Sequence, residues 1–241
     1  MGTVIVRYAS PMAAFGHSGR FDDRPSAATP TVSSVQGMVA AAAGIARGEV
    51  WPSWIARLHL AIRIEAAGEM LVDYHTVNQP DLRRYRWLTD RDQKKVMVLR
   101  SAEGGRPATS TVISRRDYVT DATFLLALDD PTGRIAEVLA APRFALYAGR
   151  KSCPLTEPFH LGVITGTCDQ AMGTVPTVPT ADEVDAASVS RDVISFEDPG
   201  GQDAIVEDRN DRATKNSAWR PQRRWYTTVM VPTAASWFDV V

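Results

Sequence analysis

The apolar residues in the first part of the chain follow a strand pattern first and a helix pattern after it. Residues 3–8 are rich in β-branched side chains and predict a first strand. The run 35–45 contains four alanines and two glycines, and it predicts a helix that lies close to a sheet. Ser33 stands three residues before Gln36, which is the spacing of a capping box, so Ser33 is expected to be the N-cap of this helix.

A strand pattern returns after the helix. Residues 55–64 predict a second strand, and residues 70–77 predict a third that pairs with it through a turn at Ala67-Gly68. Residues 118–129 predict a buried strand, and residues 133–140 predict a second helix that ends before a proline.

Between the third and fourth predicted strands, residues 78–111 are polar and basic and should project from the core. The resulting order of strands and helices predicts the α+β class, with a ferredoxin-like or RRM-like domain over residues 1–165 and an inserted thumb at about 78–111. Residues 166–241 predict a small irregular C-terminal extension with one final strand at 223–231.

Composition narrows the class of protein. With 241 residues, 44% of them apolar and 23% charged, the chain can bury a substantial core. No apolar run approaches the length of a membrane span and no signal peptide is indicated, so a cytoplasmic protein without membrane contact is expected. Cys153 and Cys168 have no metal-ligand spacing and the four histidines are scattered, so neither a metal nor another cofactor is expected.

The net charge of −1 conceals a separation of charge along the chain. Residues 81–118 hold ten basic and five acidic residues, whereas residues 182–208 hold nine acids and a single arginine. Such separation can make one face attractive to phosphate, although solvated surface is an equally simple interpretation.

The segment Tyr147-Ala-Gly149-Arg150-Lys151-Ser152-Cys-Pro154 carries the most specific chemistry. Gly149 permits close backbone approach or a positive φ, and the next three side chains supply two cations and a hydroxyl, which together suit a phosphate. The segment lacks the spacing of a Walker loop, and by its residues alone it is also compatible with an ordinary basic turn.

This segment resembles the Gly-Arg-(Arg or Lys)-Ser-Cys-Pro signature of the CasD family of CRISPR proteins. Further motifs resemble that family in the same order: Ser10-Pro-Met through Phe15-Gly16, Pro30-Thr-Val-Ser33 through Gly37, Asp73-Tyr-His-Thr-Val77, Arg116-Asp-Tyr118 through Asp121-Ala-Thr-Phe124, and Arg223-Arg-Trp-Tyr226. The first loop departs from the family pattern, because Ser10, Ala13 and Phe15 replace its glycine, glutamine and tryptophan.

The resemblance implies a non-catalytic, RNA-binding subunit of a type I-E surveillance complex, Cascade, that grips the 5′ handle of the crRNA. It also implies contacts with a CasC-type backbone subunit, with a CasA-type large subunit, and with target DNA through the complex. The residues expected to contact RNA are Arg20, Ser33, Tyr74, His75, Arg115, Arg116, Tyr147, Gly149, Arg150, Lys151 and Ser152. The thumb residues expected to contact a partner or to stack on bases are Arg83, Arg84, Tyr85, Arg86, Trp87, Lys94 and Lys95.

Two alternatives stay open at this point. Relatives in the type I-C system cut CRISPR repeat RNA without metal, and His75, Tyr74 and either Lys94 or Lys95 can be assigned to the acid, base and cation roles of that chemistry. The third alternative is an RRM-like module that binds protein and no RNA.

Overall fold

The computed structural model describes residues 2–16, 23–80, 85–89, 95–99, 109–196, 205–212 and 219–240. Its strands are β1 (Gly2–Ala9), β2 (Met12–Ala13), β3 (Asp23–Arg24), β4 (Leu60–Ala66), β5 (Glu69–Pro80), β6 (Tyr85–Thr89), β7 (Lys95–Leu99), β8 (Thr109–Thr120), β9 (Thr123–Asp130), β10 (His160–Thr165), β11 (Ser188–Ser195), β12 (Ile205–Arg212) and β13 (Trp219–Pro232). Its helices are α1 (Val32–Ala42), α2 (Ser53–Ala56), α3 (Arg134–Ala140), α4 (Cys168–Thr174) and the 3-10 turn Ala181–Glu183. None of the described helices is long and apolar enough to cross a membrane.

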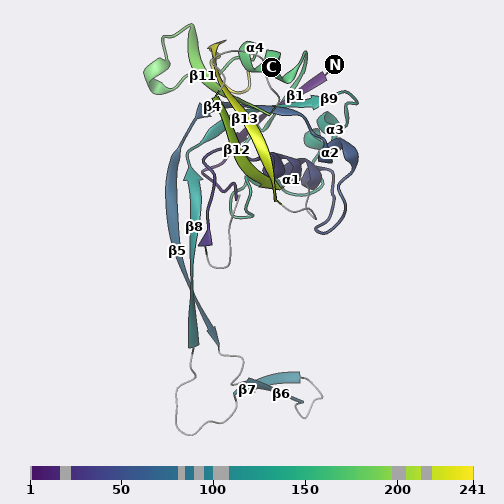
Figure 1. The fold of residues 1–241 in the computed structure, drawn as a ribbon, viewed down its shortest axis with the longest axis vertical. Coiled ribbons are helices and arrows are strands. Elements are labelled where there is room, and N and C mark those ends of the chain that lie inside the picture. The colour runs from purple at the N-terminus through teal and green to yellow at the C-terminus, as the bar shows by residue number, and fades with distance from the viewer. Residues whose placement is uncertain are drawn as a thin grey trace.

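Within the described part of the chain, seven strands form one sheet in the order β10-β1-β9-β4-β11-β13-β12, and each neighbouring pair is antiparallel (Figure 1). β1 lies between β9 and β10, so the first strand of the chain is paired on both edges. The predicted strand at 3–8, helix at 133–140 and final strand at 223–231 are all present.

The two faces of this sheet are covered by different parts of the chain. On one face, Val4, Leu126 and Leu128 pack with Val39 of α1 and Leu139 of α3. On the other face, Ile5, Leu125 and Val193 pack with Met172 of α4 and with Val240 near the C-terminus. Because side chains alternate along a strand, β1 and β9 contribute to both cores, and each fully buried aliphatic side chain stabilises the fold by about 1.5–3 kcal/mol.

The N-cap of helix α1 lies two residues before Ser33, the residue that the capping-box spacing indicated. Thr31 is the N-cap: its Oγ1 accepts from the backbone N–H of Ser34, whose own Oγ accepts from the backbone N–H of Thr31. Gln36 is buried instead and donates to the carbonyls of Ile55 and Ala56, which fastens α1 to α2. The prediction of Ser33 as N-cap was therefore wrong, because Gln36 serves packing between helices.

Three predicted strands, at 55–64, 70–77 and 118–129, have different boundaries or partners in the structure. Residues 55–64 do not form one strand, because 53–56 are helical and β4 begins at Leu60. After Gly68, the chain does not fold back on β4: β5 leaves the large sheet and pairs with β8 along its whole length. β8 and β9 are separate strands, since Asp121 between them takes a φ of 56°.

β5 and β8 form a long two-stranded ribbon that extends away from the large sheet (Figure 1). β2 pairs antiparallel and β3 pairs parallel with β8 near the base of this ribbon. β6 and β7, which lie in the predicted thumb insertion, pair with each other.

The C-terminal region contains more strand than the sequence pattern indicates. The expectation was an irregular extension with one strand, whereas β11, β12 and β13 all join the large sheet, with β11 directly beside β4. Part of this strand pattern is hidden by Arg191, a buried cation that occupies an inward position between Val189 and Val193.

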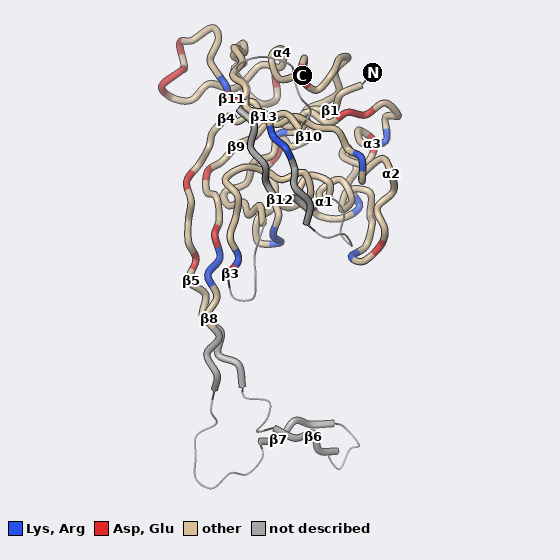
Figure 2. Tube along the Cα trace, viewed as in Figure 1, with Lys and Arg blue, Asp and Glu red and all other residues tan. Residues whose placement is uncertain are grey.

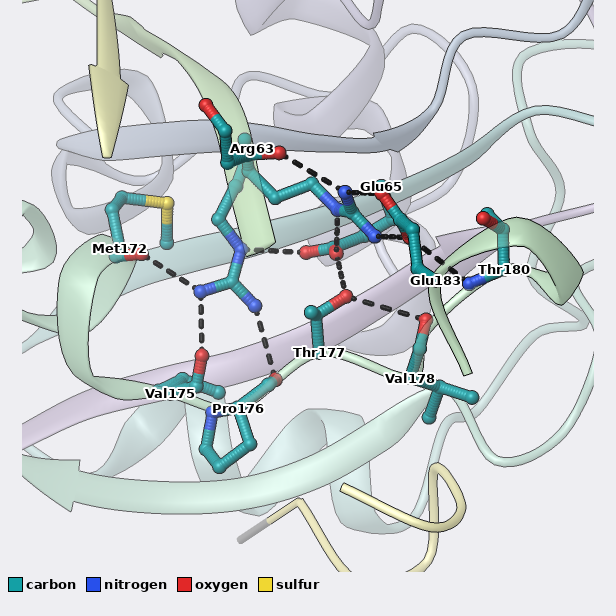
Figure 3. Close-up of polar contacts among 11 residues, drawn as sticks. Arg63, Glu65, Met172, Val175, Pro176, Thr177, Val178, Thr180 and Glu183 are labelled. Atoms are coloured by element: carbon teal, nitrogen blue, oxygen red, sulfur yellow. Dashed lines mark hydrogen bonds and ion pairs between the residues drawn. The ribbon is translucent and has the colours of Figure 1, made fainter. Parts of the chain in front are cut away.

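A buried ionic network attaches the segment after α4 to the sheet. Arg63 on β4 has no exposed surface, and its guanidinium donates to Glu65 at 2.6 Å and to the carbonyls of Met172, Val175 and Pro176 (Figure 3). Burial lowers the pKa of Arg63, and the adjacent Glu65 carboxylate offsets only part of this lowering. Thr177 donates to the other oxygen of Glu65. Since every one of these partners is internal, the network is structural.

Candidate nucleic-acid interface

A groove of about 550 Å³ lies at the N-terminus of α1, between this helix and the loop that follows Ala148. Thr31, Ser33, Ser34, Gly149 and Lys151 line it with polar or backbone groups, and Ile45, Trp51 and Phe144 are among its apolar lining residues. Three residues singled out in the sequence, Ser33, Gly149 and Lys151, therefore lie around the same groove, although Ser33 is more than 100 positions from the other two.

The helix end gives the groove a preference for anions. The first backbone N–H groups of an α-helix carry a partial positive charge, which attracts phosphate and carboxylate groups. α1 has eleven residues and no acidic residue in its first turn, so nothing within the helix neutralises this end. The exposed Lys151 adds a full positive charge at the lining of the same groove.

Gly149 brings the loop close to the first loop of the chain. Its φ is +88°, a conformation that favours glycine, and a Cβ at this position would collide with the carbonyl oxygen of Ala14. The close approach is held by the backbone N–H of Ala14, which donates to Ala148 at 3.0 Å, and by the N–H of Ala148, which donates to Cys153 at 2.7 Å. The glycine is therefore required by the packing of two loops.

The side chain of Arg150 makes its contacts with other residues of the protein. Its guanidinium donates to the carbonyls of Asp117 at 3.2 Å and Arg24 at 2.8 Å, and it lies over the ring of Tyr118 at 4.6 Å. These contacts connect the loop to β8 and β3, so Arg150 positions the neighbouring Lys151. Ser152 is exposed, and its hydroxyl lies 3.7 Å from the Cys153 sulfur.

Tyr147 lies at the start of this loop, in an isolated bridge with Pro154. Its carbonyl accepts a hydrogen bond of 3.3 Å from the hydroxyl of Tyr8. Burial raises the pKa of Tyr8, which keeps this hydroxyl protonated as a donor. The contact of Tyr147 that the structure shows is thus a backbone contact within the protein.

Basic residues also gather at the base of the ribbon. Arg115 and Arg116 are neighbours on β8, and Arg24 on β3 is in register with Arg116 and exposed. Successive residues of a strand point to opposite faces, so only one of the two adjacent arginines shares a face with Arg24. In Figure 2 basic positions lie side by side on β3 and β8.

Tyr74 and His75 occupy opposite faces of β5, because they are adjacent in a strand. Tyr74 is 61% exposed and pairs across the ribbon with Arg115, whereas His75 lies opposite Ser114 and is 3.8 Å from Asp73. Tyr74 and His75 are consequently not brought to one point, as a shared role in RNA cleavage would require.

The other predicted contact residues are only partly described. Arg20, Arg83, Arg84 and Lys94 lie outside the described residues. Tyr85, Arg86 and Trp87 belong to β6, and Lys95 begins β7, which pairs with it. In the described ranges no group of three or more His, Cys, Asp or Glu residues is placed to hold a metal ion.

Sequence reasoning did not select four residues that border these surfaces. Arg47, Trp51 and Phe144 line the groove, and Arg24 lies beside Arg116. Phe144 is 48% exposed, which leaves its ring accessible for stacking. Each stands in a loop or a two-residue strand, where no hydrophobic period distinguishes it.

The comparison with known families extends over almost the whole chain. The family model for CRISPR-associated protein (Cas_Cas5) matches residues 3–231. The chain belongs to the Cas5 family. The resemblance to CasD found in the sequence is therefore confirmed at the level of the family.

Known proteins similar to this Cas5-family chain include one curated relative and two solved structures. It is 32% identical over 167 residues to "CRISPR system Cascade subunit CasD" of Escherichia coli (strain K12), a match that covers 66% of this chain and 70% of that protein. A chain of the solved "CRISPR RNA-guided surveillance complex" is 27% identical with a TM-score of 0.66 and covers 96% of this chain and 90% of its own length. A "Cas protein" crystal structure, at 22% identity and a TM-score of 0.62 over 97% of this chain and 100% of its own, has a similar fold.

Proposed function

We propose that this Cas5-family chain is the CasD-type subunit of a type I-E surveillance complex and that it binds the 5′ handle of the crRNA without cleaving it. The observation that carries the proposal is the groove in which the N-terminus of α1, Gly149 and Lys151 meet. A helix end and a lysine supply groups that bind phosphate, and the apolar lining at Trp51 and Phe144 suits an unstacked base.

The handle path proposed here runs from this groove toward the base of the ribbon. Arg150 joins the two regions, since it contacts the carbonyls of both β8 and β3. Ser33, Lys151 and Ser152 are proposed to contact the handle in or near the groove, and Arg24, Arg115, Arg116, Tyr74 and His75 are proposed to contact it at the ribbon. Binding at both regions fits a single strand, which is held by cations along its backbone and by planar side chains against its bases.

The order β10-β1-β9-β4 supports a ferredoxin-like interpretation of residues 1–165, because β1, α1, β4, β9, α3 and β10 follow one another as in a βαββαβ unit. In this proposal residues 166–241 extend the sheet of that unit. The thumb and the handle site together are proposed to contact a CasC-type backbone subunit, while the CasA-type large subunit and the target DNA meet the chain in the assembled complex.

The experiment is a measurement of handle binding by Lys151→Ala across a range of salt concentrations. Loss of one phosphate contact should weaken binding and lower the log-log salt slope by about 0.7 for a single strand. The matched control is Arg134→Ala, which removes an exposed cation that does not line the groove. An unchanged affinity and slope in a folded Lys151→Ala protein would exclude the groove as a phosphate site.

A further inference from the structure

The groove at the N-terminus of α1 continues along the helix toward its other end. Ser33, Gly37 and Ala41 all line it, and residues four positions apart lie one above another on the same face of a helix. Since each residue of a helix rises by about 1.5 Å, Ser33 and Ala41 are about 12 Å apart along the axis. The groove is therefore long enough to hold more than a phosphate at the helix end.

The two ends of this groove differ in chemistry. Ser33 lies at the end formed by the N-terminus of α1, which attracts anions. Phe144 lies near the last turn of α1, because the backbone N–H of the preceding Arg143 donates to the carbonyl of Ala42 at 2.9 Å. One end thus suits a phosphate and the other a planar base, which are the two ends of a nucleotide.

Gly37 lies midway between these ends, and no contact within the described protein requires a glycine there. It is an interior residue of α1, and a Cβ at its position would have no protein atom within 4 Å. A glycine inside a helix destabilises it relative to alanine, because glycine has more conformational freedom to lose. The absent side chain leaves open space in the groove.

Other glycines of the described chain have reasons within the protein. Gly68 and Gly149 combine a positive φ with a Cβ position that would collide with a backbone carbonyl. Gly173 is the other glycine of the described helices, and it also has open space around it. It is the residue before the end of α4, whereas Gly37 is in the middle of α1.

We infer that Gly37 admits one unpaired nucleotide of the bound strand, which lies along the groove with its phosphate at Ser33, its ribose over Gly37 and its base against Phe144. This inference rests on the proposed function and adds the orientation of the ligand and the residue that makes room for it. A nucleotide can occupy the groove in this way only when its base is unstacked, so the groove selects single strands over duplexes.

The test compares Gly37→Ala and Gly37→Leu with the unaltered full chain. Both substitutions introduce a better helix former, so neither should lower the melting temperature. Affinity for a single-stranded handle oligonucleotide, measured by fluorescence anisotropy, should fall at least about tenfold in Gly37→Leu, because the new side chain fills the groove. Gly37→Ala adds one methyl group and should have a smaller effect. A lower melting temperature in both variants would assign Gly37 to packing and overturn the inference.

Gly173→Leu is the matched control, since Gly173 has open space around its missing Cβ and does not line the groove. This variant should bind the handle like the unaltered chain. An equal loss of affinity in Gly37→Leu and Gly173→Leu would overturn the inference.

Phe144→Ala tests the position of the base. It should weaken handle binding by the unaltered chain but have no further effect in Gly37→Leu, because the nucleotide that contacts Phe144 is already excluded. Fully additive losses in the double variant would show that Gly37 and Phe144 contact separate parts of the ligand, contrary to the inference.

Lys151→Ala separates this inference from the proposed function. If Lys151→Ala weakens handle binding and Gly37→Leu does not, the handle site stands and the inference is overturned. If only Gly37→Leu weakens binding, the proposed function loses its phosphate contact, while the position of the ribose and base is supported. If neither variant alters the affinity, the handle binds elsewhere and both proposals are overturned.

Discussion

At the scale of single residues, the loop that carries Lys151 depends on the missing Cβ of Gly149 and on the planar guanidinium of Arg150. The first permits the loop to lie against Ala14, and the second connects the loop to β8 and β3. In the proposed function, neither residue has to contact RNA in order to affect its binding. Their substitution should therefore act through the position of Lys151.

Gly149→Val should lower the melting temperature and weaken handle binding, although both cations of the loop are retained. The physical reasons are a positive φ, which costs about 1–3 kcal/mol for such a residue, and the collision with the Ala14 carbonyl. Gly48→Val is the control, because Gly48 also has a positive φ but has open space around its missing Cβ. Thermal unfolding of both variants isolates the collision, and equal effects would show that the loops are not packed as described.

Arg150→Ala should destabilise the protein, since it removes two hydrogen bonds and the contact with Tyr118, at about 0.5–1.5 kcal/mol for each hydrogen bond. Arg150→Lys keeps the charge but loses the planar fork, so it should restore little of the lost stability. Both variants are compared by chemical denaturation and by the salt slope of handle binding. Full restoration of stability and slope by lysine would mean that only the charge of Arg150 matters.

At the scale of elements, the ionic network shows how one short segment is attached to the sheet. Arg191 of β11 donates twice to the Glu183 carboxylate, at 2.8 and 2.7 Å, and once to Glu65 at 3.4 Å. Glu183 also accepts from the backbone N–H of Thr180. The 3-10 turn at Ala181–Glu183 is thus connected through Arg191 and Glu65 to Arg63 on β4.

Glu183 makes part of this attachment dependent on pH. The hydrogen bonds from Arg191, followed by that from the Thr180 backbone, lower the pKa of Glu183 from 4.5 to about 2. A carboxylate with a lowered pKa stabilises the folded state above its unfolded pKa, and this contribution is lost as the pH falls from about 4.5 to about 2.

Glu183→Gln should therefore lower the melting temperature at neutral pH, and its difference from the unaltered chain should shrink below about pH 4.5. The effect should be modest, because the side chain of Glu183 remains 28% exposed. Glu137→Gln on α3, an exposed carboxylate without an ion pair to any described residue, is the control. A difference between Glu183→Gln and the unaltered chain that stays constant from pH 7 to pH 3 would contradict the role of the network.

Sequence periodicity predicted α3 well because this helix has one buried face, and β1, which is buried on both faces, was predicted from its run of β-branched residues. It was wrong about the partner of β5, because a pattern of burial reports which positions are covered and says nothing about which strand lies beside them. β11 was missed because Arg191, a charged residue, takes an inward position. A strand pattern that counts only apolar residues cannot include it.

The candidate site was predictable to a different extent. The Gly149–Lys151 segment was selected because glycine followed by cations has a direct chemical interpretation, and the structure places it beside Ser33 at one groove. The contacts of Arg150 with main-chain carbonyls depend on where β3 and β8 pass, which only the tertiary structure determines. For the same reason the position of Arg24 beside Arg116 had no signal in the sequence.

At the scale of the whole molecule, the C-terminal strands are part of one sheet with the N-terminal ones. β11 pairs with β4, and α4 covers the sheet face formed by Ile5, Leu125 and Ala127. Removing residues 166–241 would expose this face and leave the edge of β4 that pairs with β11 without a partner. The boundary at residue 165 thus cuts through a core.

A chain truncated after Thr165 should be unable to persist as a stable monomer, because it loses the cover of α4 and the pairing of β11. Circular dichroism melting and light scattering measure the outcome, with the chain shortened only by residue 241 as the control. A monomeric truncated protein that melts cooperatively at the temperature of the full chain would show that residues 1–165 are an independent domain.

The position of β1 in the sheet also affects how the chain folds during its synthesis. β1 lies between β9 and β10, and Val6 pairs with Leu126, a residue that the ribosome adds 120 positions later. At a translation rate of about 5–20 residues per second, this delay is about 6–24 seconds. During that interval this apolar segment has no strand to pair with, and it stays available for binding by chaperones.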